Sequence, residues 1–127
     1  MIRVADYIVQ RLVEAGIDTT FLITGRGILY LSDALAKNDQ IQPISVHHEQ
    51  AAAFAAVGYA QYTNKLGSCI VSTGCASTNA LTGVLNAWQD GVPLIVISGQ
   101  NKLQETVAFT GKNIRTFGSQ EANLIPV

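Results

Sequence analysis

The spacing of apolar side chains divides the chain into alternating helical and extended segments. Val4, Ile8 and Leu12 recur at helical intervals, which predicts an amphipathic helix over residues 2–16 with Gly16 as its stop signal. Comparable spacing predicts three more helices, which run through Leu29, Leu31 and Leu35, from Glu49 to about Tyr62, and over residues 80–90. The chain therefore has a strong helical component on which strands must pack.

Short runs rich in β-branched residues lie between these helices and predict strands. They are TTFLIT at 19–24, IQPISV at 41–46, GSCIVST at 67–73 and PLIVISG at 93–99. The last run is the clearest candidate for a buried strand, because four consecutive residues are β-branched or leucine. Pro43 lacks a backbone N–H, so its strand is expected at a sheet edge or to begin there. Strands and helices that alternate at this spacing predict a three-layer α/β/α fold with a mainly parallel central sheet.

Composition and charge narrow the classes of function. The chain has 127 residues, 48% of them hydrophobic and only 13% charged, and its net charge is -1. Without a basic cluster, electrostatic binding to nucleic acid or to an anionic membrane is not expected. No apolar run is long enough to span a membrane, and the N-terminus lacks the plan of a signal peptide. Cys69 and Cys75 have no metal-ligand spacing, so we expect free thiols, no metal site and a cytoplasmic protein.

Candidate chemistry gathers at the junctions that follow the strands. In parallel α/β folds, ligands bind at the carboxyl ends of the strands. These junctions are TGRG at 24–27, HHEQ at 47–50, STGCASTN at 72–79, in which GCASTN is expected to form a turn, and SGQN at 98–101. None of them matches a known phosphate-binding loop, so a nucleotide site has only the fold to support it.

Two longer stretches resemble a known family. HHEQAAAFAAVGYAQYTNKLG, followed by STGCASTNALTGVLNAWQDGVPLIVISGQ, is similar to the N-terminal, pyrimidine-binding domain of thiamine-diphosphate-dependent enzymes, nearest to the acetolactate synthase group. The resemblance runs in unbroken order from the first helix to SQE at 119–121. It implies the thiamine-diphosphate-binding fold, with residues 1–127 as the pyrimidine-binding domain.

The resemblance gives Glu49 a catalytic role. Glu49 matches the family glutamate that hydrogen-bonds N1′ of the cofactor's aminopyrimidine ring and exchanges a proton with it, which activates thiamine diphosphate for chemistry on 2-oxo acids. Taken without the motif, an acid in the first turn of a helix is more simply explained by the helix dipole, which it stabilises by about 0.3–1 kcal/mol. If Glu49 is catalytic, loss of its carboxylate should lower turnover. If it only balances the helix dipole, the loss should cost a little stability and leave turnover nearly unchanged.

Other residues take part by the same resemblance, and some depart from the family pattern. Thr24 and Arg26 stand where proline and glycine are usual, and Cys75 interrupts the common Gly-Pro-Gly turn. Arg26 is expected either to hold a substrate carboxylate or phosphate, or to be a solvated surface residue. His47 and His48 are ambiguous between structural and site roles, and His48 is the one that matches the family. The expected cofactor-binding residues are Glu49, Gly74, Cys75 and Asn79, and the expected substrate-pocket residues are Gly25, Arg26, His48, Gln100 and Gln120.

The resemblance also implies partners outside this chain. In the family, the diphosphate and its Mg2+ are held by a second domain with a Gly-Asp-Gly motif, which is absent here, and active sites form between chains. We therefore expect a domain truncated at its C-terminal end and inactive alone, and a homodimer or tetramer in the full enzyme. The expected substrate is a small 2-oxo acid. A flavin is compatible with the family, but no residue here indicates one.

Two other classes of function remain open. Cys75 lies between a strand and a helix, as the nucleophile of a hydrolase does, with His47 or His48 as a base on the neighbouring junction. Alternatively, the chain is a non-catalytic assembly module that keeps the fold for its interface. An intact Glu49 favours the enzyme over the module.

Overall fold

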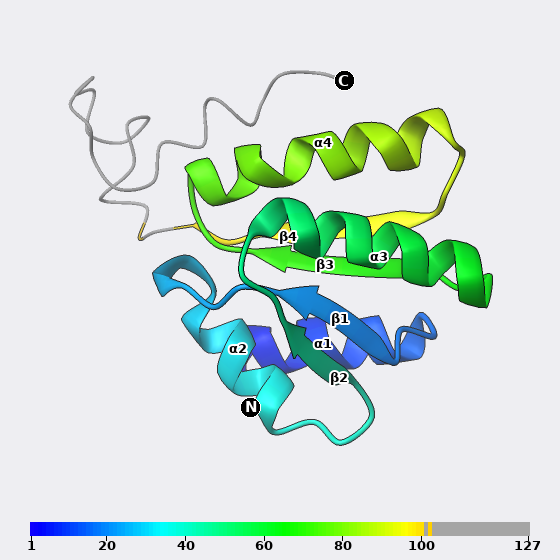
Figure 1. Ribbon diagram of the computed structural model, residues 1–127. Helices are drawn as coiled ribbons and strands as arrows, with labels where there is room; N and C mark the ends of the chain where they lie inside the picture. The colour runs from blue at the N-terminus through cyan, green and yellow to red at the C-terminus, as the bar shows by residue number, and fades with distance from the viewer. Residues whose placement is uncertain (101, 103–127) are drawn as a thin grey trace.

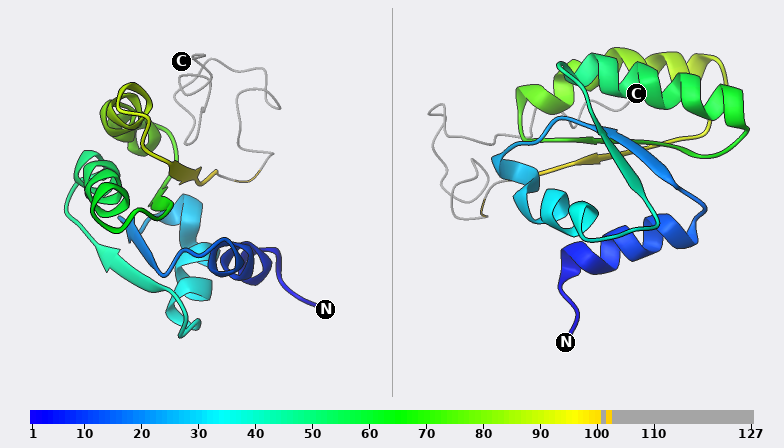
Figure 2. Two further views of the ribbon diagram at one scale, coloured as in Figure 1. Left: turned by 90° about the vertical axis from the view of Figure 1, so that its right-hand side faces the viewer. Right: turned by 60° about the horizontal axis from the view of Figure 1, so that its bottom comes forward.

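In the part of the chain that the structure describes, four parallel strands form one sheet between two pairs of helices (Figure 1; Figure 2). The computed structural model describes residues 1–100 and 102. In chain order the elements are α1 (Val4–Glu14), β1 (Thr19–Leu22), the 3-10 helix η1 (Arg26–Ile28), α2 (Leu29–Ala36), β2 (Gln42–Ser45), α3 (Glu49–Thr63), β3 (Gly67–Val71), α4 (Cys75–Gln89) and β4 (Leu94–Ser98). The predicted three-layer α/β/α class is confirmed, and all strand pairs among the described residues are parallel.

The strand order places a change of direction in the middle of the sheet. The order is β2-β1-β3-β4, so the chain first moves outward from β1 to β2 and then returns to the other side of β1. Helices α1 and α2 therefore cover one face of the sheet, whereas α3 and α4 cover the other (Figure 1). In such sheets the carboxyl ends of the two strands that flank the reversal, here β1 and β3, are the usual ligand-binding position.

Of the two predictions made for the outer strands, one is confirmed and the other is wrong. β2 lies at the edge, with Pro43 opposite Thr20, as the missing N–H of proline predicts. The prediction that PLIVISG is the clearest buried strand is wrong, since β4 is the other outer strand of the four and its residues are partly exposed. Among the described strands, the fully buried ones are β1 and β3, because each has a strand on both sides and helices on both faces.

The α1/α2 face is built from large aliphatic side chains. Val9, Leu12 and Leu35 pack with Ile28 and Ile70, all of them buried. Charged side chains join the two helices at their outer surface.

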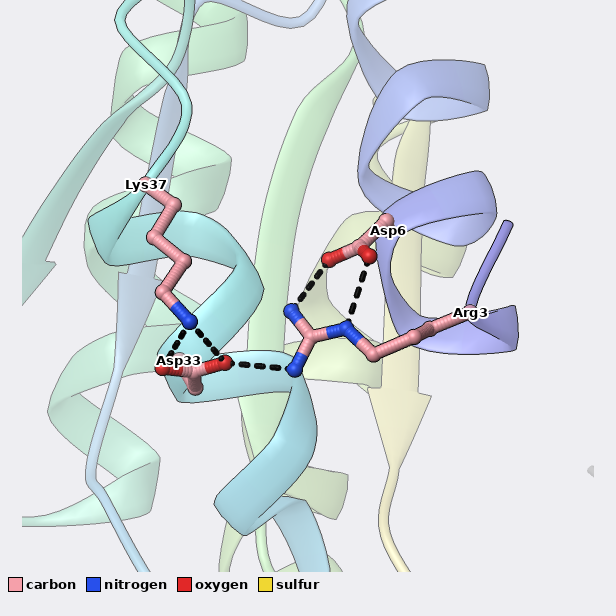
Figure 3. Close-up of polar contacts among 4 residues, drawn as sticks. All are labelled: Arg3, Asp6, Asp33 and Lys37. Atoms are coloured by element: carbon pink, nitrogen blue, oxygen red, sulfur yellow. Dashed lines mark hydrogen bonds and ion pairs between the residues drawn. The ribbon is translucent and has the colours of Figure 1, made fainter. Parts of the chain in front are cut away.

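Arg3, the N-cap residue of α1, is the centre of this outer contact (Figure 3). Its guanidinium donates to Asp6 at 2.7 Å and to Asp33 at 2.8 Å, and the ammonium of Lys37 lies 2.9 Å from Asp33. We call these four residues the Arg3 network. It connects the start of α1 to α2 through exposed ion pairs.

The α3/α4 face is built from small side chains instead. Buried alanines of both helices pack with Phe21, Cys69 and Val71 of the sheet. A Cβ atom at Gly83 would lie 2.5 Å from the Cβ of Ala53, so the two helices approach as closely as a glycine permits. This close approach fixes the position of one helix against the other.

Candidate functional site

The junctions after β1, β3 and β4 meet at the carboxyl edge of the sheet, on the left of Figure 1. The backbone N–H of Gly27 donates to Ser72 Oγ at 3.2 Å. A Cβ at Gly25 would lie 2.4 Å from the same hydroxyl oxygen, and one at Gly99 would lie 2.4 Å from the carbonyl oxygen of Gly27. Three junctions that the sequence predicted as a ligand-binding edge are therefore in direct contact. Gly27 and Ser72 were given no role from the sequence, although both fall within the quoted junctions.

Helix α3 begins at this edge, where β2 ends. His48 is its N-cap residue, and the ring Nδ1 accepts a hydrogen bond from the backbone N–H of Gln50 at 3.2 Å. Because Nδ1 accepts, a neutral ring carries its proton on Nε2. The bond to Nδ1 satisfies the backbone N–H of Gln50 at the start of the helix. Because His48 is exposed, its ring also brings the Nε2–H donor to this edge.

Glu49 is the first residue of α3 and is partly buried. It is the only charged residue within α3 and α4, whose sequences are EQAAAFAAVGYAQYT and CASTNALTGVLNAWQ. Its place in the first turn suits the positive end of the helix dipole. A dipole alone, however, does not account for the side chain that hydrogen-bonds Glu49.

Asn79 donates from Nδ2 to Glu49 Oε2 at 3.0 Å. Residues 75–79 do not form the expected turn, because α4 already begins at Cys75 and places Asn79 in its second turn. Only Gly74 stays outside the helix, as its N-cap with a φ of 68°, a conformation that glycine adopts at little cost. Asn79 thus contacts Glu49 and does not cap α4.

The neighbouring strand β3 adds no charge near Glu49, because its sequence is GSCIV. Cys69 of β3 is fully buried, and burial raises the pKa of its thiol to about 12, with the negative charge of Glu49 as a second cause. Cys69 therefore stays a neutral thiol at neutral pH. Sequence reasoning classed it only as a free cysteine, because its closeness to Glu49 depends on how α3 crosses the sheet.

Three serines fix the start of α4 against the strand ends. Ser77 Oγ hydrogen-bonds the backbone carbonyl of Ser72 at 3.1 Å and the hydroxyl of Ser98. Beside them, the buried Thr73 Oγ1 has no hydrogen-bond partner among the residues that the structure describes. The first turn of α4, which carries Cys75 and leads to Asn79, is consequently held to both β3 and β4.

The remaining predicted residues are spread along the same edge. Arg26 opens η1 and is exposed, as are Cys75 at the start of α4 and Gln100 after β4. Gly25 lies against Ser72. Gln120 falls outside the described residues.

The described residues offer little for the hydrolase alternative. Cys75 has no hydrogen bond to His47 or His48 within residues 1–100, and Nδ1 of His48 already caps α3. The same residues contain no group of His, Cys, Asp or Glu that could hold a metal ion. Within them, too, no helix has the length and apolar character needed to cross a membrane.

Comparisons with known proteins show the family to which the chain is similar. The family described as "Thiamine pyrophosphate enzyme, N-terminal TPP binding domain" matches residues 2–121. The chain is 43% identical over 96 residues to the acetolactate synthase large subunit of Haemophilus influenzae, which covers 76% of this chain and 17% of that protein. It is 39% identical over 113 residues to the acetolactate synthase large subunit of Corynebacterium glutamicum. That alignment covers 87% of this chain and 18% of that protein. It is also 38% identical over 96 residues to the chloroplastic acetolactate synthase of Arabidopsis thaliana, covering 76% and 14%.

These relatives are several times longer than the segment that they share with this chain, which spans less than a fifth of each of them. The match to the family nevertheless covers almost the whole chain, including HHEQ and STGCASTN. The chain therefore belongs to the thiamine pyrophosphate enzyme family, as an N-terminal TPP-binding domain similar to that of acetolactate synthases.

Proposed function

We propose that the chain binds the aminopyrimidine end of thiamine diphosphate and that Glu49 activates the cofactor in an acetolactate synthase-like enzyme. One observation carries the proposal. Glu49, the only charge on the α3/α4 layer, has Oε2 bonded by Asn79 and no described hydrogen-bond donor on Oε1. A carboxylate that only balanced the helix dipole would not need an oriented side-chain partner 30 residues away.

The residues at the edge fit the aminopyrimidine ring. The carboxyl group of Glu49 at this edge suits a heteroaromatic ring nitrogen, which alternately needs a hydrogen-bond donor and an acceptor. Cys69 stays neutral behind it, since its pKa is raised to about 12. Beneath this edge, Phe21, Val71 and buried alanines form the core that supports α3 and α4.

When bound, thiamine diphosphate supplies a nucleophilic carbon and an electron sink for 2-oxo acid chemistry. The contribution of this chain is acid–base chemistry at one atom. Glu49 holds a proton at Oε1 or releases it to the facing ring nitrogen, while Asn79 keeps Oε2 in place. A positioned carboxyl group can share a proton with such a nitrogen as a general acid or base. Gly25, Gly74 and Gln100 lie along the same edge.

We propose that the diphosphate end is held elsewhere. No metal-ligand cluster occurs within the described residues, and neither α3 nor α4 carries a cation. We propose that a diphosphate-binding domain outside this sequence supplies Mg2+ and the charge that neutralises the phosphates, and that a small 2-oxo acid binds between the two. Arg26 and His48 are the residues of this chain that we assign to its carboxylate.

We also propose that a second copy of the chain covers the outer surface of α3 and α4. Large apolar side chains are exposed there, with relative exposures of 42% for Phe54, 90% for Tyr62, 43% for Leu85 and 76% for Trp88. A layer with so little charge is suited to burial in an interface. The oligomer size, the flavin and the cytoplasmic location remain predictions from the sequence.

The test is Glu49→Gln in the enzyme that contains this domain, with exchange of the cofactor's C2 proton followed by NMR. Glutamine keeps the shape and can still accept from Asn79, but it cannot give up a proton. We expect exchange to slow by about 10²–10⁴-fold, the usual contribution of a positioned acid–base group. The fold, measured by circular dichroism, should not change.

Glu14→Gln is the matched control. Glu14 is an exposed residue of α1 that pairs with Arg11, far from the carboxyl edge. This variant should exchange the C2 proton at the parent rate. If Glu49→Gln also exchanges at that rate, Glu49 is a helix-capping acid and the chain fits the non-catalytic assembly module better.

A further inference from the structure

We propose that Asn79 is a positioning residue that determines which oxygen of Glu49 carries the exchangeable proton. The inference rests on the proposed function of Glu49 and deepens it. Asn79 donates to Oε2 at 3.0 Å, whereas none of the described residues donates to Oε1. Asn79 thus makes two chemically equal oxygens different.

The chemistry of the amide explains why asparagine suits this task. An ionised carboxylate only accepts hydrogen bonds, so Asn79 must present its NH2 group to it. With Oε2 occupied by that donor, a proton added to the carboxyl group goes to Oε1. When the proton leaves for the ring nitrogen, the O–H electron pair stays on Oε1, and Asn79 keeps both of its own protons. No other reactant is needed.

The neutrality of the amide matters as much as its geometry. A lysine or arginine at this position would hold Glu49 ionised through its own charge and oppose proton uptake. Asn79 instead orients the carboxyl group and adds no charge, so both protonation states stay accessible. The absence of any other charged residue within α3 and α4 serves the same end.

The close packing of α3 and α4 holds Glu49 and Asn79 in position. Ala53 lies one helical turn after Glu49, and Gly83 lies one turn after Asn79, so the two pairs stack along the same helix faces. A Cβ at Gly83 would lie 2.5 Å from the Cβ of Ala53, which shows that the helices are in contact at this point. The hydroxyl of Ser77 fixes the preceding turn to the strand ends. Asn79 is therefore placed by rigid backbone on both sides.

The experiment compares Asn79→Ala, Glu49→Gln and the double variant in the holoenzyme. Without its anchor, the carboxyl group of Glu49 takes several orientations, and we expect C2-proton exchange to slow by about 10- to 100-fold, as misplacement of a reacting group does. In the Glu49→Gln background, Asn79→Ala should change the remaining rate by less than about twofold, because Asn79 acts through Glu49. Additive losses in the double variant would overturn the inference.

Asn86→Ala is the matched control. Asn86 lies on the same helix, and its amide also donates to a carboxylate, Asp90 Oδ2 at 2.9 Å, but the pair is exposed at the far end of α4. Its loss should leave the exchange rate unchanged. An equal loss in both variants would show that any side-chain deletion on α4 slows the enzyme, and would also overturn the inference.

Asn79→Asp separates positioning from structure through its pH profile and keeps the native shape if Asn79→Ala fails to fold. The new carboxylate repels Glu49 when ionised and can donate to it when protonated. The ratio of variant to parent exchange rates should therefore rise as the pH falls, whereas a merely structural defect gives a ratio independent of pH.

A ligand-free measurement completes the test. A crystal structure of the Asn79→Ala enzyme without cofactor should show the carboxyl group of Glu49 in more than one orientation, and that of Asn86→Ala should show one. If Glu49→Gln slows exchange while Asn79→Ala does not, the proposed function stands and the positioning role fails. If neither slows it, both fail.

Discussion

The two helical layers of this domain handle charge in opposite ways. On the α1/α2 layer, Asp6 and Asp33 each pair with cations, and the Arg3 network lies in solvent (Figure 3). Within α3 and α4, the only charge is Glu49, and its described partner is the neutral amide of Asn79. A carboxylate paired with cations is kept ionised, whereas one paired with an amide can change its protonation state.

Packing follows the same division. The α1/α2 layer fills its core with Val9, Leu12 and Leu35, and such side chains tolerate small shifts of a helix. The α3/α4 layer uses alanine and glycine at backbone contact, which leaves no room for adjustment. The layer with the proposed chemistry is thus the one whose geometry is most strictly fixed. The predictions below test that contrast, beginning with the largest expected effect.

Gly83→Ala should damage the domain more than any other change considered below. The added Cβ would lie 2.5 Å from Ala53 Cβ and 3.1 Å from its carbonyl carbon, so the helices must separate. Overpacking of this kind costs about 1–3 kcal/mol in the free energy of unfolding. Urea denaturation measures it, and C2-proton exchange should slow in parallel because Glu49 moves away from Asn79.

Gly58→Ala is the matched control for the same substitution on the same layer. A Cβ at Gly58 meets nothing within 4 Å, and the residue is an exposed position inside α3. Alanine is the better helix former there, so the free energy of unfolding should rise by about 0.5–1 kcal/mol. If both variants destabilise the domain equally, backbone contact between α3 and α4 is not what fixes the layer.

The fold was predictable from the sequence as far as local pattern decides it. Alternating helices and strands, parallel pairing and the edge position of Pro43 were all accessible, because each follows from periodicity or from a missing donor. The order of strands across the sheet was not. An apolar run such as LIVI reads the same at the centre and at the outer position where β4 lies.

The prediction of a turn at the start of α4 failed for a different reason. Ser77, Thr78 and Asn79 compete with helix formation through their own side chains, and so favour a turn when taken alone. In the structure, Ala76 and Ala80 are buried against α3 and the sheet, and this packing makes the segment helical. Glu49 and Asn79 were each predicted as site residues, but their contact depends on that helix register and could not be read from the sequence.

A second prediction concerns Asp18, which ties the start of β1 to the end of α3. Its carboxylate accepts from the ammonium of Lys65, from the hydroxyl of Tyr59 and from Thr19, and these bonds lower its pKa to about 2. A lowered pKa means that the stabilisation is complete above about pH 4, the ordinary range of an aspartate, and is lost as the pH falls towards 2.

Asp18→Asn removes this dependence on pH. Because the group is partly exposed and screened, we expect a loss of about 1 kcal/mol in the free energy of unfolding at pH 7 and a difference from the parent that shrinks between pH 4 and pH 2. Urea denaturation over that range measures it. Asp39→Asn, at an exposed turn residue, is the control and should follow the parent curve. A difference that stays constant down to pH 2 would contradict the assignment of the acid-sensitive bond to Asp18.

The smallest effect should come from the Arg3 network, although it contains the most ion pairs. Hydrogen bonds from Lys37 and then from Arg3 lower the pKa of Asp33, yet all of these groups are exposed to water and counter-ions. Exposed pairs gain little, because solvent already stabilises each charge and the long side chains lose freedom on pairing. Asp33→Asn should therefore change the free energy of unfolding less than Asp18→Asn does at low salt, and the change should disappear near 1 M salt. C2-proton exchange should not respond. A loss that exceeds that of Gly83→Ala would show that charge pairing, and not close packing, holds the more important layer together.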